Sequence, residues 1–125
     1  MAKYFFNEED SHPVQLTSAD IILRQQLEYS ISKYFYNGCD RTIQDLLSEC
    51  RWYVTTINGT LTLAIECRDE MINWQVLRKM VPMAKLLKQV VTSAKIRVYP
   101  PEAQGIPFEM RVDELGVYRE HQEGA

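Results

Sequence analysis

The sequence predicts an α+β fold: one two-layer domain over residues 1–125, with helices packed on an antiparallel sheet of about four strands. Three observations lead to this prediction. Apolar residues recur at helical spacing over residues 18–36, and an Asn-Gly pair separates two strand-like segments. Two further alternating segments follow a long helical stretch, so the element order is ααββαββ, with no linker between domains.

The bulk composition fits a protein of this kind. The chain has 125 residues, 46% hydrophobic content and a net charge of −3, which suits one domain with its own core. The charge is unevenly spread: residues 71–101 carry six basic and no acidic groups, whereas both flanks are acidic. We interpret the basic middle as neutralising the flanks within the fold. The alternative is that part of it meets an acidic partner.

The first helix is expected over about residues 18–36. Thr17 can cap it, and Asp20 three residues later completes a capping-box pattern. Asn37-Gly38 predicts a left-handed stop. One broad apolar face indicates the side that packs on the core, and it consists of Ala19, Leu23, Leu27, Ile31, Tyr34 and Phe35.

Two more helical stretches begin at aspartates. Asp40 can cap a short helix with an apolar face of Ile43, Leu46, Leu47 and Cys50. Asp69 can cap a longer stretch to about Ser93, whose core face is expected to be Ile72, Val76, Met80, Met83, Leu87 and Val90. Pro82 either kinks this stretch or separates two helices. The apolar stripe continues in phase, which favours a kink or tight break.

The strongest local pattern is a hairpin around Asn58-Gly59. Asn-Gly is the favoured pair of a type I′ turn, because both positions need positive φ. A two-residue turn fixes the register, so Ile57 should face Thr60 and Trp52 should face Ile65. The face toward the core is then expected to carry Trp52, Val54, Thr56, Leu61, Leu63 and Ile65.

The last two strands are predicted from alternation. Residues 95–99 alternate up to Pro100, and residues 108–113 alternate again with Phe108, Met110 and Val112 inward. The ends of the chain are expected to be mobile: an arm over residues 1–13 and an acidic tail over residues 116–125.

Recognisable catalytic and metal-binding patterns are missing from the sequence. The five glycines form no phosphate or dinucleotide loop, and three scattered cysteines with His12 and His121 form no zinc pattern. The carboxylates Glu66, Asp69 and Glu70 cluster at a helix start, where capping explains them. We therefore expect no enzyme, no cofactor and no metal. With no signal peptide pattern and no membrane-spanning run, a cytoplasmic location is expected.

Cys50 and Cys67 would face each other if the hairpin ladder extended beyond Trp52 and Ile65. That arrangement is within the reach of a disulfide. The interpretation we prefer for a cytoplasmic protein is two buried thiols that act as small apolar groups.

Two helical faces carry residues typical of interfaces. On the first helix, Ile22, Tyr29 and Tyr36 form a row that predicts self-association as a homodimer; coverage by the N-terminal arm is the alternative. On the third helical stretch, Trp74, Arg78, Lys85 and Lys88 should form an aromatic and basic partner-binding strip, provided that Pro82 does not rotate the second half. The alternative there is an ordinary basic face with a buried Trp.

The sequence thus favours a non-enzymatic protein-binding module of the adaptor or assembly-chaperone type. It would hold a partner protein or its acidic or C-terminal peptide through aromatic and basic surface residues. The alternative is a regulatory domain that binds a small anionic ligand between the sheet and the third helix, with Arg97 or Arg111 as charge partner. Nucleic acid is disfavoured as a partner because the flanks of the basic segment are acidic.

Overall fold

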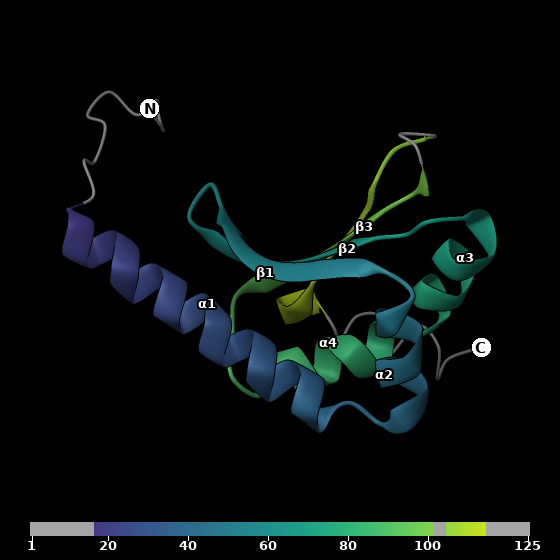
Figure 1. Ribbon diagram of the computed structural model, residues 1–125, viewed down its shortest axis with the longest axis horizontal. Helices are drawn as coiled ribbons and strands as arrows, with labels where there is room; N and C mark the ends of the chain where they lie inside the picture. The colour runs from purple at the N-terminus through teal and green to yellow at the C-terminus, as the bar shows by residue number, and fades with distance from the viewer. Residues whose placement is uncertain (1–16, 102–104, 115–125) are drawn as a thin grey trace.

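The computed structural model describes residues 17–101 and 105–114, which form four helices and one mixed four-stranded sheet (Figure 1). In chain order the elements are α1 (Ser18–Gly38), α2 (Arg41–Ser48), β1 (Arg51–Ile57), β2 (Thr60–Glu66), α3 (Glu70–Arg78), α4 (Met80–Lys88), β3 (Ala94–Tyr99) and β4 (Phe108–Arg111), followed by a 3-10 turn (Val112–Glu114). The α+β class is confirmed. The predicted arm and tail lie outside the described residues.

The hairpin of β1 and β2 has the register that its turn predicts. Asn58 and Gly59 have φ angles of 51° and 79°, as a type I′ turn requires. Ile57 faces Thr60, and the pairing continues in step as far as Arg51 opposite Glu66. The bounds of both strands agree with the sequence pattern.

The predicted antiparallel sheet is wrong in one pairing. The strand order is β1-β2-β3-β4, and β2 runs parallel to β3, whereas the other two pairs are antiparallel. The reason is the connection: α3 and α4 carry the chain back across the sheet to the end where β2 began. A helical crossover of this kind joins parallel strands.

The position of β2 in the middle of the sheet buries it on both faces. Leu63 and Ile65 face the helices and are fully buried, as predicted. Thr62 and Ala64 alternate with these residues and point to the opposite face of the sheet, yet they are buried as well. Their neighbours on β1 and β3 cover them, since cross-strand side chains lie against each other on each face of a sheet.

The start of α1 agrees with the sequence and its end does not. Thr17 and Asp20 form the capping box, with hydrogen bonds of 3.1 Å and 3.2 Å. Gly38 is the last helical residue and does not adopt a left-handed conformation. Its small size has a different use: a Cβ atom at Gly38 would lie 2.8 Å from Cδ1 of Leu86 on α4. Gly38 therefore allows α1 and α4 to approach closely.

The third helical stretch is two helices that meet at Lys79. This residue has φ −106° and ψ 12°, outside the helical range, so it ends α3 and precedes α4. Pro82 lies in the first turn of α4, where the missing N–H costs no hydrogen bond. The predicted core face is buried from Ile72 to Leu87, but Val90 lies beyond the end of α4 and is exposed.

The last strand is shorter than predicted. It ends at Arg111 and continues into the 3-10 turn, while Met110 and Val112 are buried as expected. Phe108, the third residue predicted to face inward, is exposed. Figure 1 shows α1, α2 and α4 on the same side of the sheet.

The turn supports a first prediction. Gly59→Ala should lower the free energy of unfolding by about 1–2 kcal/mol, because a side chain disfavours positive φ although nothing blocks the space for its Cβ. Urea unfolding followed by circular dichroism measures this change. As a control, Asn58→Asp keeps a residue that tolerates positive φ and should change stability by less than about 0.5 kcal/mol. Equal stability of the Gly59→Ala and wild-type proteins would contradict the I′ turn.

Candidate functional site

Exposed large apolar side chains are the main surface feature of the described residues. Eight of the eleven such side chains lie on α1 or α3. Those on α1, here the α1 surface, are Ile21, Ile22, Leu23, Leu27, Tyr29 and Tyr34. Those on α3, here the α3 surface, are Met71 and Trp74. Exposed apolar residues gathered in this way are typical of sites that contact another molecule.

The α1 surface exists because the amino-terminal half of α1 extends beyond the sheet (Figure 1). Only Ile31 and Phe35, both in the second half, are buried in the core. Thr56 at the edge of the sheet donates a 2.7 Å hydrogen bond to Glu28. Leu23 and Leu27 were predicted to face the core, and this is wrong: they are 62% and 55% exposed.

The three residues predicted for self-association differ in their surroundings. Ile22 and Tyr29 are 52% and 64% exposed and free to contact another molecule. The ring of Tyr36 is half-buried and stacks on Trp52, with 5.8 Å between the ring centroids and 11° between the planes. Phe35 meets the same indole edge-on at 6.0 Å. Tyr36 therefore anchors α1 to β1, which makes it a poor candidate for an interface.

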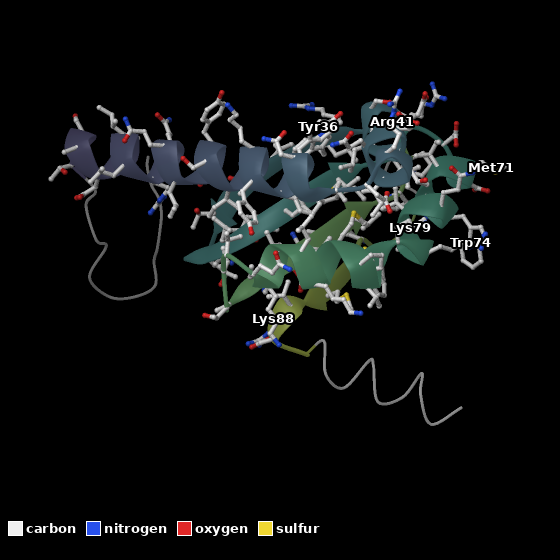
Figure 2. All side chains as sticks on the ribbon, turned by 90° about the horizontal axis from the view of Figure 1, so that it is seen from below. Tyr36, Arg41, Met71, Trp74, Lys79 and Lys88 are labelled. Atoms are coloured by element: carbon white, nitrogen blue, oxygen red, sulfur yellow. The ribbon has the colours of Figure 1, made fainter. Side chains whose placement is uncertain are left out.

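Trp74 is exposed, as a partner-binding residue must be. Its side chain is 63% exposed and lines a hollow of about 330 Å³ with Glu70, Asn73, Pro100 and Pro101. Met71, one helical turn before Trp74, is 66% exposed. Figure 2 shows both at the same end of the molecule. Sequence reasoning missed Met71, although its spacing of three residues from Trp74 places the two on one helix face.

Arg78 does not share the hollow of Trp74. It lines a second hollow, a groove of about 510 Å³ between α2 and α3. Acidic residues of α2 and basic residues of α3 face this groove, which is lined by Thr42, Asp45, Leu46, Glu49, Ile72, Gln75, Arg78 and Lys79. Trp74 and Arg78 are four residues apart on α3, yet they border different hollows.

The predicted basic strip is not continuous. Lys85 and Lys88 belong to α4, and the break at Lys79 separates them from Trp74 and Arg78. Figure 2 shows Lys88 well apart from Trp74. Lys88 lies near Asp113 instead. The pKa of the Asp113 carboxyl is lowered, mainly by a hydrogen bond from Arg111 and further by the charge of Lys88. The structure therefore groups Trp74 with Met71, not with the two lysines.

The arginines proposed for an anionic ligand do not lie between the sheet and α3. Arg97 and Arg111 alternate with the buried Ile96 and Met110, so they are on the opposite face of the sheet. Nε of Arg97 is 3.2 Å from a carboxylate oxygen of Glu109, and Arg111 binds Asp113 at 2.9 Å. The predicted location of that site is therefore wrong.

Two of the three clustered carboxylates, Asp69 and Glu66, have structural partners. Asp69 accepts a 2.8 Å hydrogen bond from the backbone N–H of Ile72 and caps α3. Glu66 accepts a 3.0 Å hydrogen bond from the hydroxyl of Tyr53. Within residues 17–101 and 105–114, no group of three or more His, Cys, Asp or Glu side chains is placed to hold a metal ion. His12 and His121 lie outside the described residues.

Comparison with known proteins adds no relative: no family model, no curated protein and no solved structure matches this chain. Among the helices of the described residues, none is long and apolar enough to cross a bilayer.

The contrast between two tyrosines of α1 supports a second prediction. Tyr36→Ala should lower the free energy of unfolding by about 2–4 kcal/mol, because it removes a stacked, half-buried ring from the contact with Trp52. Tyr29→Ala removes a ring that is mostly in solvent in the single chain, so at a protein concentration too low for self-association it should change stability by less than about 0.5 kcal/mol. Urea unfolding measures both variants. If both variants lose the same free energy of unfolding, the contact of Tyr36 with Trp52 does not hold α1 on the sheet.

Proposed function

We propose that this chain is a non-enzymatic protein-binding module of the adaptor or assembly-chaperone type. It docks through two separate places, the α1 surface and the α3 surface. The observation that carries the proposal is the concentration of exposed large apolar side chains on these two helices. In Figure 1 the amino-terminal half of α1 lies at one end of the sheet and α3 lies at the other, so the two surfaces can be occupied at the same time.

The α1 surface serves self-association. Apart from Tyr34, whose hydroxyl donates a 3.3 Å hydrogen bond to Gln89, its side chains lie on the amino-terminal half and the middle of α1. No residue of that half is buried in the core, so a second copy of the helix can approach it. In a two-fold symmetric dimer the same residues are buried on both copies. Complete burial of one Leu or Ile side chain stabilises a complex by about 1.5–3 kcal/mol, so a few such residues offset a large part of the entropy lost on association.

The α3 surface serves a partner protein. Met71 and Trp74 offer an apolar contact next to the hollow bounded by Pro100 and Pro101. Aromatic residues and methionine are enriched at the centres of protein interfaces. Arg78 lies one turn further along the same helix and is exposed; it borders the groove between α2 and α3, so a partner segment reaches its charge only by extending beyond the hollow of Trp74. A partner segment with an apolar side chain and an acidic group or C-terminal carboxylate matches this arrangement.

The α1 surface supports a third prediction. Leu23→Glu with Leu27→Glu should weaken self-association by about 100-fold or more, because two buried leucines per protomer are replaced by charges. The fold should be retained, since both side chains are exposed and Glu is a good helix former. Sedimentation velocity over a concentration series measures the dimer. A wild-type protein that is monomeric throughout the series contradicts the homodimer.

The α3 surface supports a fourth prediction. Met71→Glu with Trp74→Glu should abolish capture of the partner and leave the thermal midpoint and the dimer unchanged. This variant adds the same two charges as the α1 variant, so each variant is the matched control of the other. Capture from native lysate with mass spectrometry identifies the proteins retained by the wild type. If the α3 variant retains the same partners as the wild type, the α3 surface does not bind them and this part of the proposal is wrong.

A further inference from the structure

Cys50 and Cys67 lie opposite each other at the open end of the hairpin. Cys50 immediately precedes β1, and Cys67 immediately follows β2. The last pair of the ladder is Arg51 with Glu66, so the next pair in register is Cys50 with Cys67. Side-chain contacts on both sides support this register: Arg51 pairs with Glu66 at 3.7 Å, and Arg68 forms an ion pair with Glu49.

The backbone hydrogen bonds define the kind of pair. The N–H of Cys67 points away from β1 and donates to the carbonyl of Tyr99 on β3, at 3.1 Å. The N–H of Cys50 donates to the carbonyl of Leu47 in α2, at 3.0 Å. Neither N–H bonds the other cysteine, which defines a non-hydrogen-bonded pair. The Cα atoms of such a pair are about 4.5 Å apart, within the range of a disulfide.

The two thiols are free, but their environments differ. Cys67 is buried, whereas Cys50 is only partly buried, at the edge of the core. A hydrogen bond from the thiol of Cys67 lowers the pKa of Cys50, and the charge of Arg68 adds to this effect. The same hydrogen bond and burial raise the pKa of Cys67. Because the thiolate is the reactive form, Cys50 is the thiol that attacks first.

We propose that Cys50 and Cys67 form a thiol-modification site that reacts with low-molecular-weight disulfides and closes to an internal bridge. The thiolate of Cys50 attacks one sulfur of the small disulfide, forms a mixed disulfide and releases one small thiolate. The thiolate of Cys67 then attacks Sγ of Cys50 and releases the second. The two protons lost by the protein thiols go to the released thiolates. The protein dithiol is oxidised, and the small disulfide is reduced to two thiols.

Cys39 provides an internal contrast. It is buried at the end of α1, away from the hairpin register, and burial together with the charge of Asp40 raises its pKa to about 11. Cys39 has no cysteine opposite it in the hairpin register, so a mixed disulfide at Cys39 has no neighbouring thiol to close a bridge. The site therefore consists of Cys50 and Cys67 and leaves Cys39 reduced. This inference does not depend on the proposed docking function.

The test uses the full chain, oxidised glutathione and trypsin. After oxidation, the denatured protein should contain one free thiol instead of three. Cleavage after Arg and Lys places each cysteine in its own peptide: residues 34–41, 42–51 and 52–68. Non-reducing mass spectrometry should find 42–51 linked to 52–68 and 34–41 free. Three free thiols after oxidation, or a link to 34–41, overturns the proposal.

Two serine variants test the order of the steps, and a third is the control. Cys67→Ser should stop at the mixed disulfide, with one glutathione on residues 42–51. Cys50→Ser should react at least ten-fold more slowly than the wild type, since only buried thiols remain. Cys39→Ser should oxidise at the wild-type rate. Equal rates for the Cys50→Ser and wild-type proteins would overturn the role of Cys50 as the first nucleophile.

Discussion

The register of the β1–β2 hairpin is the constraint on which the rest of the structure depends. Because β2 is one of the two inner strands, this register decides which of its side chains meet the helices and which meet the other face. A shift by one residue would turn Leu63 and Ile65 out of the core. The same register sets Cys50 opposite Cys67 beyond the last pair. A turn of two residues thus determines both the core and the thiol pair.

A mismatch of lengths explains the α1 surface. A helix of 21 residues is about 31 Å long, whereas a strand of seven residues spans about 23 Å. The contacts that hold α1 come from its second half: Phe35 and Tyr36 on Trp52, and Gly38 against Leu86. A helix fixed at one end necessarily extends its other end past the sheet. The large apolar residues of that end are exposed.

The sequence predicted most features that depend on neighbouring residues; the left-handed stop at Gly38 is the exception. The caps at Thr17, Asp40 and Asp69, the turn at Asn58-Gly59 and the hairpin register are all local, and all are confirmed. The parallel pairing of β2 and β3 depends on where a crossover returns, and periodicity contains no such information. The helical spacing of Leu23 and Leu27 likewise identifies one face of the helix. It does not tell whether the sheet is long enough to cover that face. For the candidate site, the sequence left open whether Trp74 is exposed or buried, and the structure exposes it. Its separation from Lys85 and Lys88 depends on the break at Lys79, which the helical spacing does not contain.

The two cysteines lie close in sequence to the residues that hold the two proposed docking surfaces in place. Cys50 is two residues from Trp52, the side chain on which α1 rests, and Cys67 is two residues from Asp69, the cap of α3. These segments are already joined by the backbone pairing of β1 and β2, which ends at Arg51 opposite Glu66. Beyond that last pair lies the exposed ion pair of Arg68 with Glu49, and exposed ion pairs contribute little to stability. A covalent bond between the two sulfurs would close the open end of the hairpin without altering the apolar side chains of either surface.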